Sequence, residues 1–480
     1  MAWFSIFQIA LALLYIIRIG EFLFWLLAFM TGFEATASIH WALLPFGRVT
    51  PLAWFADLER VIFYIFAPLA PLVVLTMIFI VTLKLLAPRY LILAGQFFKQ
   101  YSPPKTESKP EIINLHPRTL LIISLVLSVV GALYPYNLNI NPEGITFGVD
   151  VYSYLDLMGP VNQDFLSAFT VAGGSRPIIL LVIFGVQHIF GLKLIDAIKY
   201  LPVLLNPLLV LSVFFMVFQS SDDLEWAALA SLFSALGFTT TVGLYSYYLT
   251  NILAMILIFS AIGFLFNTVK TKCNVSLILA CILGSLTIFT HPWTFIQYYI
   301  VILFTTLYLN RMASMKYQYY ASNTFMFFLL FTGTVDIIKV LLIRGLGSYG
   351  SIISVIPHIK EVFSFWDSNI HAFRLFFGGL LSNTIFIGLS TFGCFELNNK
   401  KSFHLFLNML LATTSICYVF ADGTIQTRLL FNIPFSVFSA LYIINSIRNT
   451  TIKKNVRFII FIFTATYMFN YVFGSLANLI

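Results

Sequence analysis

The chain has very few charged residues. Of 480 residues, 10% are Asp, Glu, Lys or Arg and 60% are hydrophobic, and the mean hydropathy is +0.93. Many apolar runs reach the roughly 20 residues that a helix needs to cross a hydrocarbon core of about 30 Å. In lipid these runs must be helices, because every backbone N–H and C=O has to be satisfied within the segment. We therefore expect an all-α, polytopic membrane helix bundle with about 12–14 transmembrane helices.

Other absences exclude further classes. The apolar runs are continuous and lack strand alternation, which excludes a transmembrane β-barrel. The net charge of +8 does not indicate a nucleic-acid partner, because the basic residues occupy short turns and form no basic face interleaved with aromatics. The cysteines lie in or beside apolar spans without metal-ligand spacing; they are Cys273, Cys281, Cys394 and Cys417.

Long polar tracts are also scarce, so an active site has to be built from loops between helices. The most polar stretch is residues 99–118, KQYSPPKTESKPEIINLHPR, whose Pro, Ser and Lys content predicts a linker. Its basic residues place it, and the N-terminus, in the cytoplasm. The sequence thus predicts a two-helix N-terminal membrane appendage over 1–98, the cytoplasmic linker 99–118, and a membrane body over 119–480.

Two loops of the body stand out. Residues 136–176 follow the first body span and are predicted to form a long external loop. Residues 345–372 mix Trp366 and Phe residues with charged ones, a pattern typical of a helix that lies in the membrane interface.

The number of crossings is ambiguous over one stretch. Counting spans forward from the linker, and backward from the basic turn at Lys270 and Lys272, gives conflicting orientations between residues 177 and 243. Either 177–191 or 226–240, each about 15 residues long, is too short to cross. The sequence alone leaves both alternatives open.

The most informative feature is the acidic, aromatic stretch GVDVYSYLD at residues 148–156, in which Asp150 is flanked by Tyr152 and Tyr154. A carboxylate just outside the bilayer of such an apolar protein marks a place for polar chemistry. Two more polar groups are predicted on the same side. His291 in THPWTF ends one span, and Arg428 in ADGTIQTRLLFNIP begins another. A base, an imidazole and a guanidinium on one side suit acid–base chemistry beside an anion.

The order of these elements resembles the GT-C superfamily of polytopic, lipid-phosphosugar-dependent glycosyltransferases, and within it the protein mannosyltransferase and aminoarabinose transferase group. The resemblance covers roughly residues 117–450. Besides the three features above, it includes GGSRPIILLVIFGVQHIFG, which enters a helix at Arg176, and the Tyr-rich YSYYLTNILAMIL. The late string TRLLFNIPFSVFSALYI is similar to the start of this group's late helices. The loop around Asp150 departs from the pattern because it lacks an acidic pair.

The resemblance implies an inverting transfer of a sugar from a polyprenyl-phosphate-linked donor to a glycan, lipid or protein acceptor at the external membrane face. Asp150 would be the catalytic base and Arg428 would neutralise the leaving phosphate. The expected substrate-binding residues are Arg428, His291, Arg176, Tyr152 and Tyr154. No cofactor is expected to be required, and a divalent metal is left open without support in the sequence.

Simpler interpretations stand beside this one. Tyr residues near a membrane surface usually belong to the aromatic belt, and we assign Tyr245, Tyr247 and Tyr248 to it. The chain as a whole also suits a polytopic transporter or a lipid flippase. Transporters place charges near mid-membrane and often show paired halves with broken helices. Here the charges of interest lie at the outer face and no paired halves are visible, which favours the enzyme. A non-catalytic subunit of a membrane complex is a third alternative.

Overall fold

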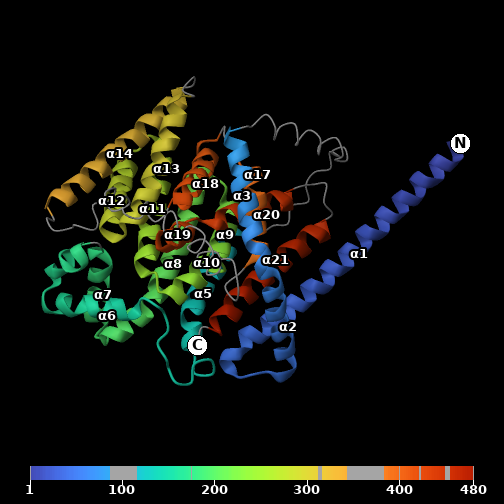
Figure 1. Cartoon of the computed structure of the whole chain (residues 1–480), viewed down its shortest axis with the longest axis horizontal. Coiled ribbons are helices and arrows are strands. Elements are labelled where there is room, and N and C mark those ends of the chain that lie inside the picture. The colour runs from blue at the N-terminus through green and yellow to red at the C-terminus, as the bar shows by residue number, and fades with distance from the viewer. Residues whose placement is uncertain are drawn as a thin grey trace.

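The computed structural model describes residues 2–86, 116–174, 176–311, 316–342, 383–398, 401–420, 423–448 and 454–478. Over these ranges the chain forms helices and turns without a strand (Figure 1). Nine described helical segments are long and apolar enough to cross a membrane, and four shorter apolar helices accompany them. The predicted all-α polytopic bundle is confirmed. The predicted interfacial helix at 345–372 and most of the linker 99–118 lie outside the described residues.

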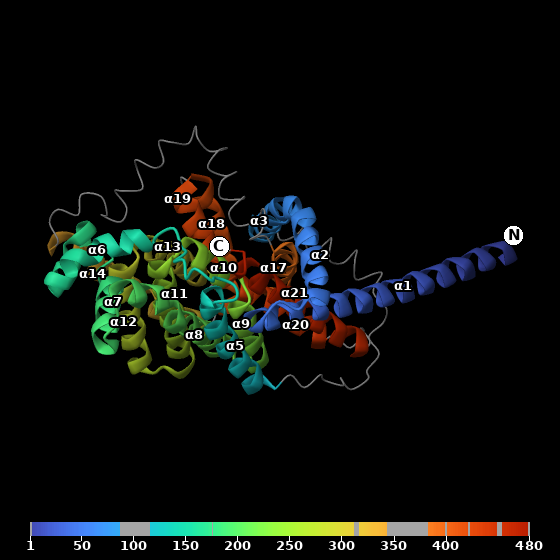
Figure 2. The same cartoon turned by 90° about the horizontal axis from the view of Figure 1, so that it is seen from below.

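Three helices form the N-terminal part, where the sequence predicted two: α1 (Ala2–Leu43), α2 (Thr50–Phe66) and α3 (Ala70–Leu86). The additional helix, α2, is amphipathic, since Ala53, Ala56 and Phe63 recur at helical spacing on its buried face. Helix α1 packs on α21 (Lys454–Leu476), and α3 packs on α17 (Thr384–Glu396) and α18 (Ser402–Phe420). The N-terminal end of α1 projects from the bundle (Figures 1 and 2).

The centre of the body is α9 (Leu224–Ala235), where every residue from Trp226 to Ala235 is buried. Such a helix, apolar on all sides, belongs in a core. It packs against α5 (Pro117–Leu133), α8 (Leu194–Ser221) and α20 (Phe435–Arg448). The indole Nε1 of Trp226 donates to the Val437 carbonyl at 2.9 Å, which anchors α9 to α20. The remaining helices of this half are α11 (Leu249–Thr271), α12 (Asn274–Thr290), α13 (Pro292–Arg311) and α14 (Lys316–Leu342).

The ambiguous stretch is resolved by a pair of helices that run end to end. Helix α9 continues after a turn into α10 (Phe238–Ser246), and together they make an apolar segment of 23 residues. Helix α7 (Pro177–Phe190) has 14 residues, or about 21 Å at 1.5 Å per residue. It is too short for a hydrocarbon core of about 30 Å. The short segment is therefore the one at 177–191.

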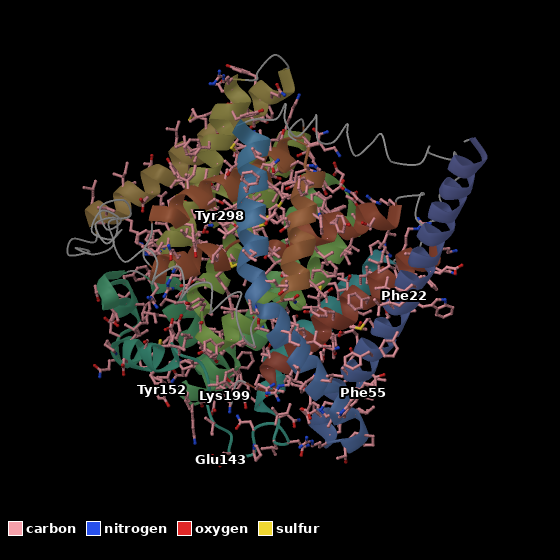
Figure 3. The ribbon with its side chains drawn as sticks, turned by 45° about the vertical axis from the view of Figure 1, so that its right-hand side comes forward. Phe22, Phe55, Glu143, Tyr152, Lys199 and Tyr298 are labelled. Carbon is pink, nitrogen blue, oxygen red and sulfur yellow. The ribbon has the colours of Figure 1, made fainter. Side chains whose placement is uncertain are left out.

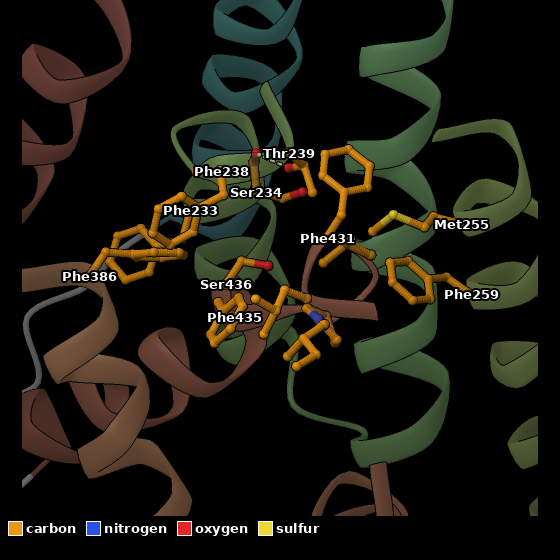
Figure 4. A pocket seen from close by; sticks show the side chains of 15 residues that line it. Phe233, Ser234, Phe238, Thr239, Met255, Phe259, Phe386, Phe431, Phe435 and Ser436 are labelled. Carbon is orange, nitrogen blue, oxygen red and sulfur yellow. Dashed lines mark hydrogen bonds between the residues drawn. The ribbon is translucent and has the colours of Figure 1, made fainter. Parts of the chain in front are cut away.

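Two helices of the body are broken. The first break separates α9 from α10 at Gly237, and the second separates α19 (Gly423–Phe431) from α20 at Pro434. Both breaks border one pocket, drawn in Figure 4. Threonine hydroxyls satisfy the carbonyls at the end of α9, with Thr239 donating to Ser234 at 3.3 Å and Thr240 to Ala235 at 3.0 Å. Broken helices are tolerated at membrane depth when such groups replace the lost bonds.

Ion pairs mark one end of the bundle. Lys270 lies 2.7 Å from Asp222, and Arg448 holds Asp223 at 2.6 Å and Glu225 at 2.7 Å. These residues begin or end α8, α9, α11 and α20. The opposite ends of the same helices carry the loop 136–176, which contains α6 (Val151–Gln163). Figure 3 shows Glu143, Tyr152 and Lys199 together at that end.

Candidate active site

The loop before α6 is held against the Tyr-rich turn between α10 and α11. The Val149 N–H donates to the Tyr245 carbonyl at 3.1 Å, and the Asp150 N–H donates to the Ser246 carbonyl at 3.3 Å. Asp150 occupies the N-cap position of α6, yet its side chain makes no capping hydrogen bond. The backbone hydrogen bonds therefore position Asp150, and its carboxylate makes no hydrogen bond that caps the helix.

Gly148 makes this approach possible. Its φ is +114°, a conformation that L side chains rarely adopt. A Cβ added there would lie 2.5 Å from Cδ2 of the Tyr247 ring. That ring cannot move away easily, because the Tyr247 hydroxyl donates to the carbonyls of Ile198 and Lys199 at 2.8 and 2.9 Å. Gly148 thus fixes how closely the Asp150 loop packs on the turn.

Gly148→Ala is expected to destabilise the protein and displace Asp150. Positive-φ strain costs on the order of 1–3 kcal/mol, and the clash with Tyr247 adds to it. The matched control is Gly144→Ala, which has φ +63° but nothing within 4 Å of its added Cβ. Thermal unfolding of the purified proteins in detergent should show a larger fall in Tm for Gly148→Ala. Equal falls for both variants would contradict the packing argument.

Arg428 lies in α19 and is held by two neighbours from the Tyr-rich turn and α11. Its guanidinium carbon lies 5.0 Å from the centre of the Tyr248 ring, and its Nη1 donates to Asn251 Oδ1 at 3.0 Å. A cation over an aromatic face and a neutral acceptor orient the guanidinium without neutralising its charge. The charge of Arg428 therefore remains available to an anion.

His291 lies between α12 and α13 and is 4% exposed. Its Nε2 is 3.3 Å from Arg428 Nη1, and its Nδ1 accepts from the Thr294 N–H at 3.2 Å. Burial is the main cause that holds the pKa of His291 well below its usual range, and the charges of Arg428 and Arg176 add to it. Burial and the neighbouring positive charges therefore favour the neutral imidazole.

Asp150 shares these two arginines. Burial raises the pKa of Asp150 above its usual range, while Arg428 and then Arg176 oppose the shift. Arg176 is the residue that precedes α7 and is half-buried. The structure thus brings Asp150, Arg176, His291 and Arg428 within electrostatic reach of one another at one end of the bundle.

The five tyrosines near the site differ in how far they are buried, and the difference does not follow the sequence-based assignment to substrate binding or to the aromatic belt. Tyr152 is 68% exposed on α6 and lies at the outer surface in Figure 3. Tyr154 is fully buried, and its hydroxyl accepts from the Thr250 N–H at 3.2 Å, so it supports the start of α11 from inside. The assignment of Tyr247 and Tyr248 to an aromatic belt is wrong, because both are buried against the site. Tyr245, at 39% exposed, remains near the surface.

Sequence analysis missed a set of neutral polar residues behind the site. They are buried and linked by hydrogen bonds; they are Asn251, Thr294, Gln297, Thr414 and Asn432. A signal was present, since amides within apolar spans are costly unless they pair. Hydropathy alone could not indicate that these amides pair with one another.

A divalent metal does not suit the charges of this site. Among the residues that the structure describes, no three His, Cys, Asp or Glu side chains gather as metal ligands. The positive charges of Arg428 and Arg176 also act on Asp150, and such charges repel a cation. That the chain needs no metal stays a prediction.

Comparisons with known proteins support the fold. Neither the family models nor the curated proteins gave a match. Among solved structures, the chain is similar to the oligosaccharyltransferase of Archaeoglobus fulgidus, crystallised as a complex with Zn and sulfate. The TM-score is 0.51 and the identity 16%, over 74% of this chain and 53% of that chain. The chain thus spans about half of that protein's length. At this identity the likeness shows the fold alone: an all-α, polytopic membrane helix bundle like that of the oligosaccharyltransferase.

Proposed function

We propose that this chain is an integral membrane glycosyltransferase. It moves a sugar from a polyprenyl-phosphate-linked donor to a glycan, lipid or protein acceptor at the external membrane face, by an inverting single displacement. The observation that carries the proposal is the meeting of one half-buried carboxylate, Asp150, with Arg428, Arg176 and a neutral His291 at one end of a GT-C type bundle.

In the proposed step, the acceptor hydroxyl gives its proton to the Asp150 carboxylate and its oxygen attacks the anomeric carbon. The bond from that carbon to the donor phosphate breaks, and its electron pair leaves with the phosphate oxygen. Arg428 meets the charge that develops on this oxygen. Because attack and departure occur on opposite faces of the sugar, the configuration inverts. Burial supports the base role, since a carboxylate with a raised pKa binds a proton more strongly.

The alternative is a transporter or lipid flippase. The two broken helices, α9–α10 and α19–α20, are features that transporters share. Against it, the ionisable cluster lies at the helix ends and not at mid-membrane. The deciding experiment uses purified protein in proteoliposomes with radiolabelled polyprenyl-phosphate sugars. Sugar transfer to an acceptor supports the enzyme. Movement of a lipid or solute without any transfer would replace our proposal by the transporter.

Membrane sidedness is testable with two cysteines at opposite ends of the bundle. Native Cys273 is exposed beside the turn between α11 and α12, and Ile145 is exposed in the loop before α6. In intact cells, an impermeant maleimide should label Ile145→Cys in a Cys273→Ser background. It should label Cys273 of the wild type only after permeabilisation. The reverse pattern would place the site in the cytoplasm and contradict an external active site.

A further inference from the structure

Five side chains, Arg428 among them, form a closed ring of polar contacts, which we call the site ring. Its members come from α11, from α19 and the turn after it, and from the start of α13 with the residue before it. Going round the ring, the distances are 3.0, 3.3, 3.0, 2.9 and 3.3 Å; the members are Arg428, Asn251, Asn432, Thr294 and His291. Because each contact needs one donor and one acceptor, the ring can be checked hydrogen by hydrogen.

The direction of the ring is fixed from outside it, by a backbone carbonyl. Gln297 Nε2 lies 3.2 Å from the Leu429 carbonyl, which can only accept, so this end of the Gln297 amide is its nitrogen. Gln297 Oε1 therefore faces Asn432, whose Nδ2 donates to it at 2.9 Å. Asn432 Oδ1 then faces Asn251 Nδ2, and Asn251 Oδ1 faces Arg428. Each of these contacts has a donor and an acceptor in this one assignment.

The tautomer of His291 follows from the donors at its Nδ1. The Thr294 hydroxyl accepts from Asn432 Nδ2 and still has its own hydrogen to direct to His291 Nδ1. The Thr294 N–H donates to the same nitrogen, because His291 is the N-cap residue of α13 and Thr294 is third in that helix. Nδ1 receives two donors and carries no hydrogen. The neutral imidazole therefore holds its hydrogen on Nε2.

One contact of the ring then joins two donors. His291 Nε2–H and Arg428 Nη1–H face each other with the nitrogens 3.3 Å apart, and neither can accept. Both hydrogens need an acceptor from outside the ring. The arginine charge and the nearby Arg176 favour an anionic acceptor over water.

We propose that His291 Nε2–H and Arg428 Nη1–H together bind one oxygen of a phosphate group, and that Thr294 and Asn432 are positioning residues that hold His291 in the tautomer this requires. That the phosphate is the polyprenyl phosphate of the donor rests on the proposed function. The inference places the anion beside the contact between His291 Nε2 and Arg428 Nη1.

A matched pair of variants tests the donor at Nε2. In His291→Asn, the side-chain oxygen replaces Nδ1 as the helix cap, but the donor at the Nε2 position is lost. In His291→Gln, the longer amide can place an N–H near that position. Affinity for a short-chain polyprenyl phosphate in nanodiscs should fall about 10- to 100-fold for Asn, as expected for a lost hydrogen bond to a charged group. Gln should bind more tightly than Asn. Wild-type affinity in the Asn variant would overturn the inference.

The tautomer itself is measurable without any ligand. Nitrogen-15 NMR of histidine-labelled protein resolves protonated from unprotonated ring nitrogens, and the signal that disappears in His291→Asn identifies His291 among seven histidines. We expect a protonated Nε2 and an unprotonated Nδ1. Thr294→Val removes the hydroxyl donor to Nδ1 at nearly constant size and keeps the backbone N–H donor, so Nδ1 should stay unprotonated while the imidazole is held less firmly and phosphate binding weakens. A protonated Nδ1 in the wild type would overturn the inference.

Failure of the proposed function looks different. A wild type that binds polyprenyl phosphate but transfers no sugar would remove the glycosyltransferase and leave the two-donor site in place. Inorganic phosphate is the second probe, because it carries the same oxygens without the lipid. Equal affinity for both would mean a site for free phosphate and would remove the lipid assignment.

Discussion

Asp150→Asn is expected to lower the rate of sugar transfer by about 10²- to 10⁴-fold, the usual contribution of a general base. The amide keeps the size and shape of the carboxylate but cannot take the acceptor's proton. Donor affinity should change little, because the phosphate is held by Arg428 and its neighbours. The measurement is transfer from a radiolabelled polyprenyl-phosphate sugar in proteoliposomes, with donor binding determined separately. Unchanged transfer would rule out Asp150 as the base.

Two controls separate chemistry from folding in this variant. Burial raises the pKa of Asp150, so the folded state favours the protonated, neutral form, and ionising the group at higher pH costs stability. Asparagine mimics the neutral form, and the Tm of the variant should therefore not fall. In the wild type, transfer needs the carboxylate and should decline as pH drops through this raised pKa, above the usual aspartate value of about 3.9. Asp150→Asn should lack that acidic limb.

Arg428→Ala is expected to reduce both donor affinity and the transfer rate, the latter by about 10²- to 10³-fold. The guanidinium meets phosphate charge in the bound donor and more charge as the phosphate leaves, so both quantities depend on it. Arg428→Lys keeps the charge but loses the planar fork that contacts Asn251 and stacks on Tyr248. It should fall between the wild type and alanine. Binding of polyprenyl phosphate and single-turnover rates provide the two measurements.

The matched control is Arg448→Ala, at the other end of the bundle. Arg448 also lies in a membrane helix, and it pairs with Asp223 and Glu225. Its loss removes one arginine of the same kind without touching the proposed site, so transfer and donor affinity should stay at wild-type levels. If Arg448→Ala lowered transfer as much as Arg428→Ala does, the effect would be structural and the phosphate role of Arg428 would fail.

Much of the architecture was predictable because hydropathy is a local property of the chain. The apolar runs predicted the helix bundle, and length alone left only two candidates for the non-crossing segment. Predictions from local patterns failed in the N-terminal part. Two helices were predicted there and three are present, because the buried face of the additional helix α2 depends on packing against other helices. A buried tyrosine and one in the aromatic belt also give the same local pattern, which explains the error at Tyr247 and Tyr248.

The sequence by itself determined the class of protein and named the ionisable residues, since charge and aromaticity stand out against an apolar background. Only the tertiary structure decided which of them meet. The approach of Asp150, His291 and Arg428 depends on how the helix ends that carry them pack together, and on the close packing of the loop that contains Gly148. The neutral amides behind them, and the tautomer of His291, follow from hydrogen bonds between residues far apart in the chain. Such bonds depend on distance and direction in space, and no local pattern of residues encodes either.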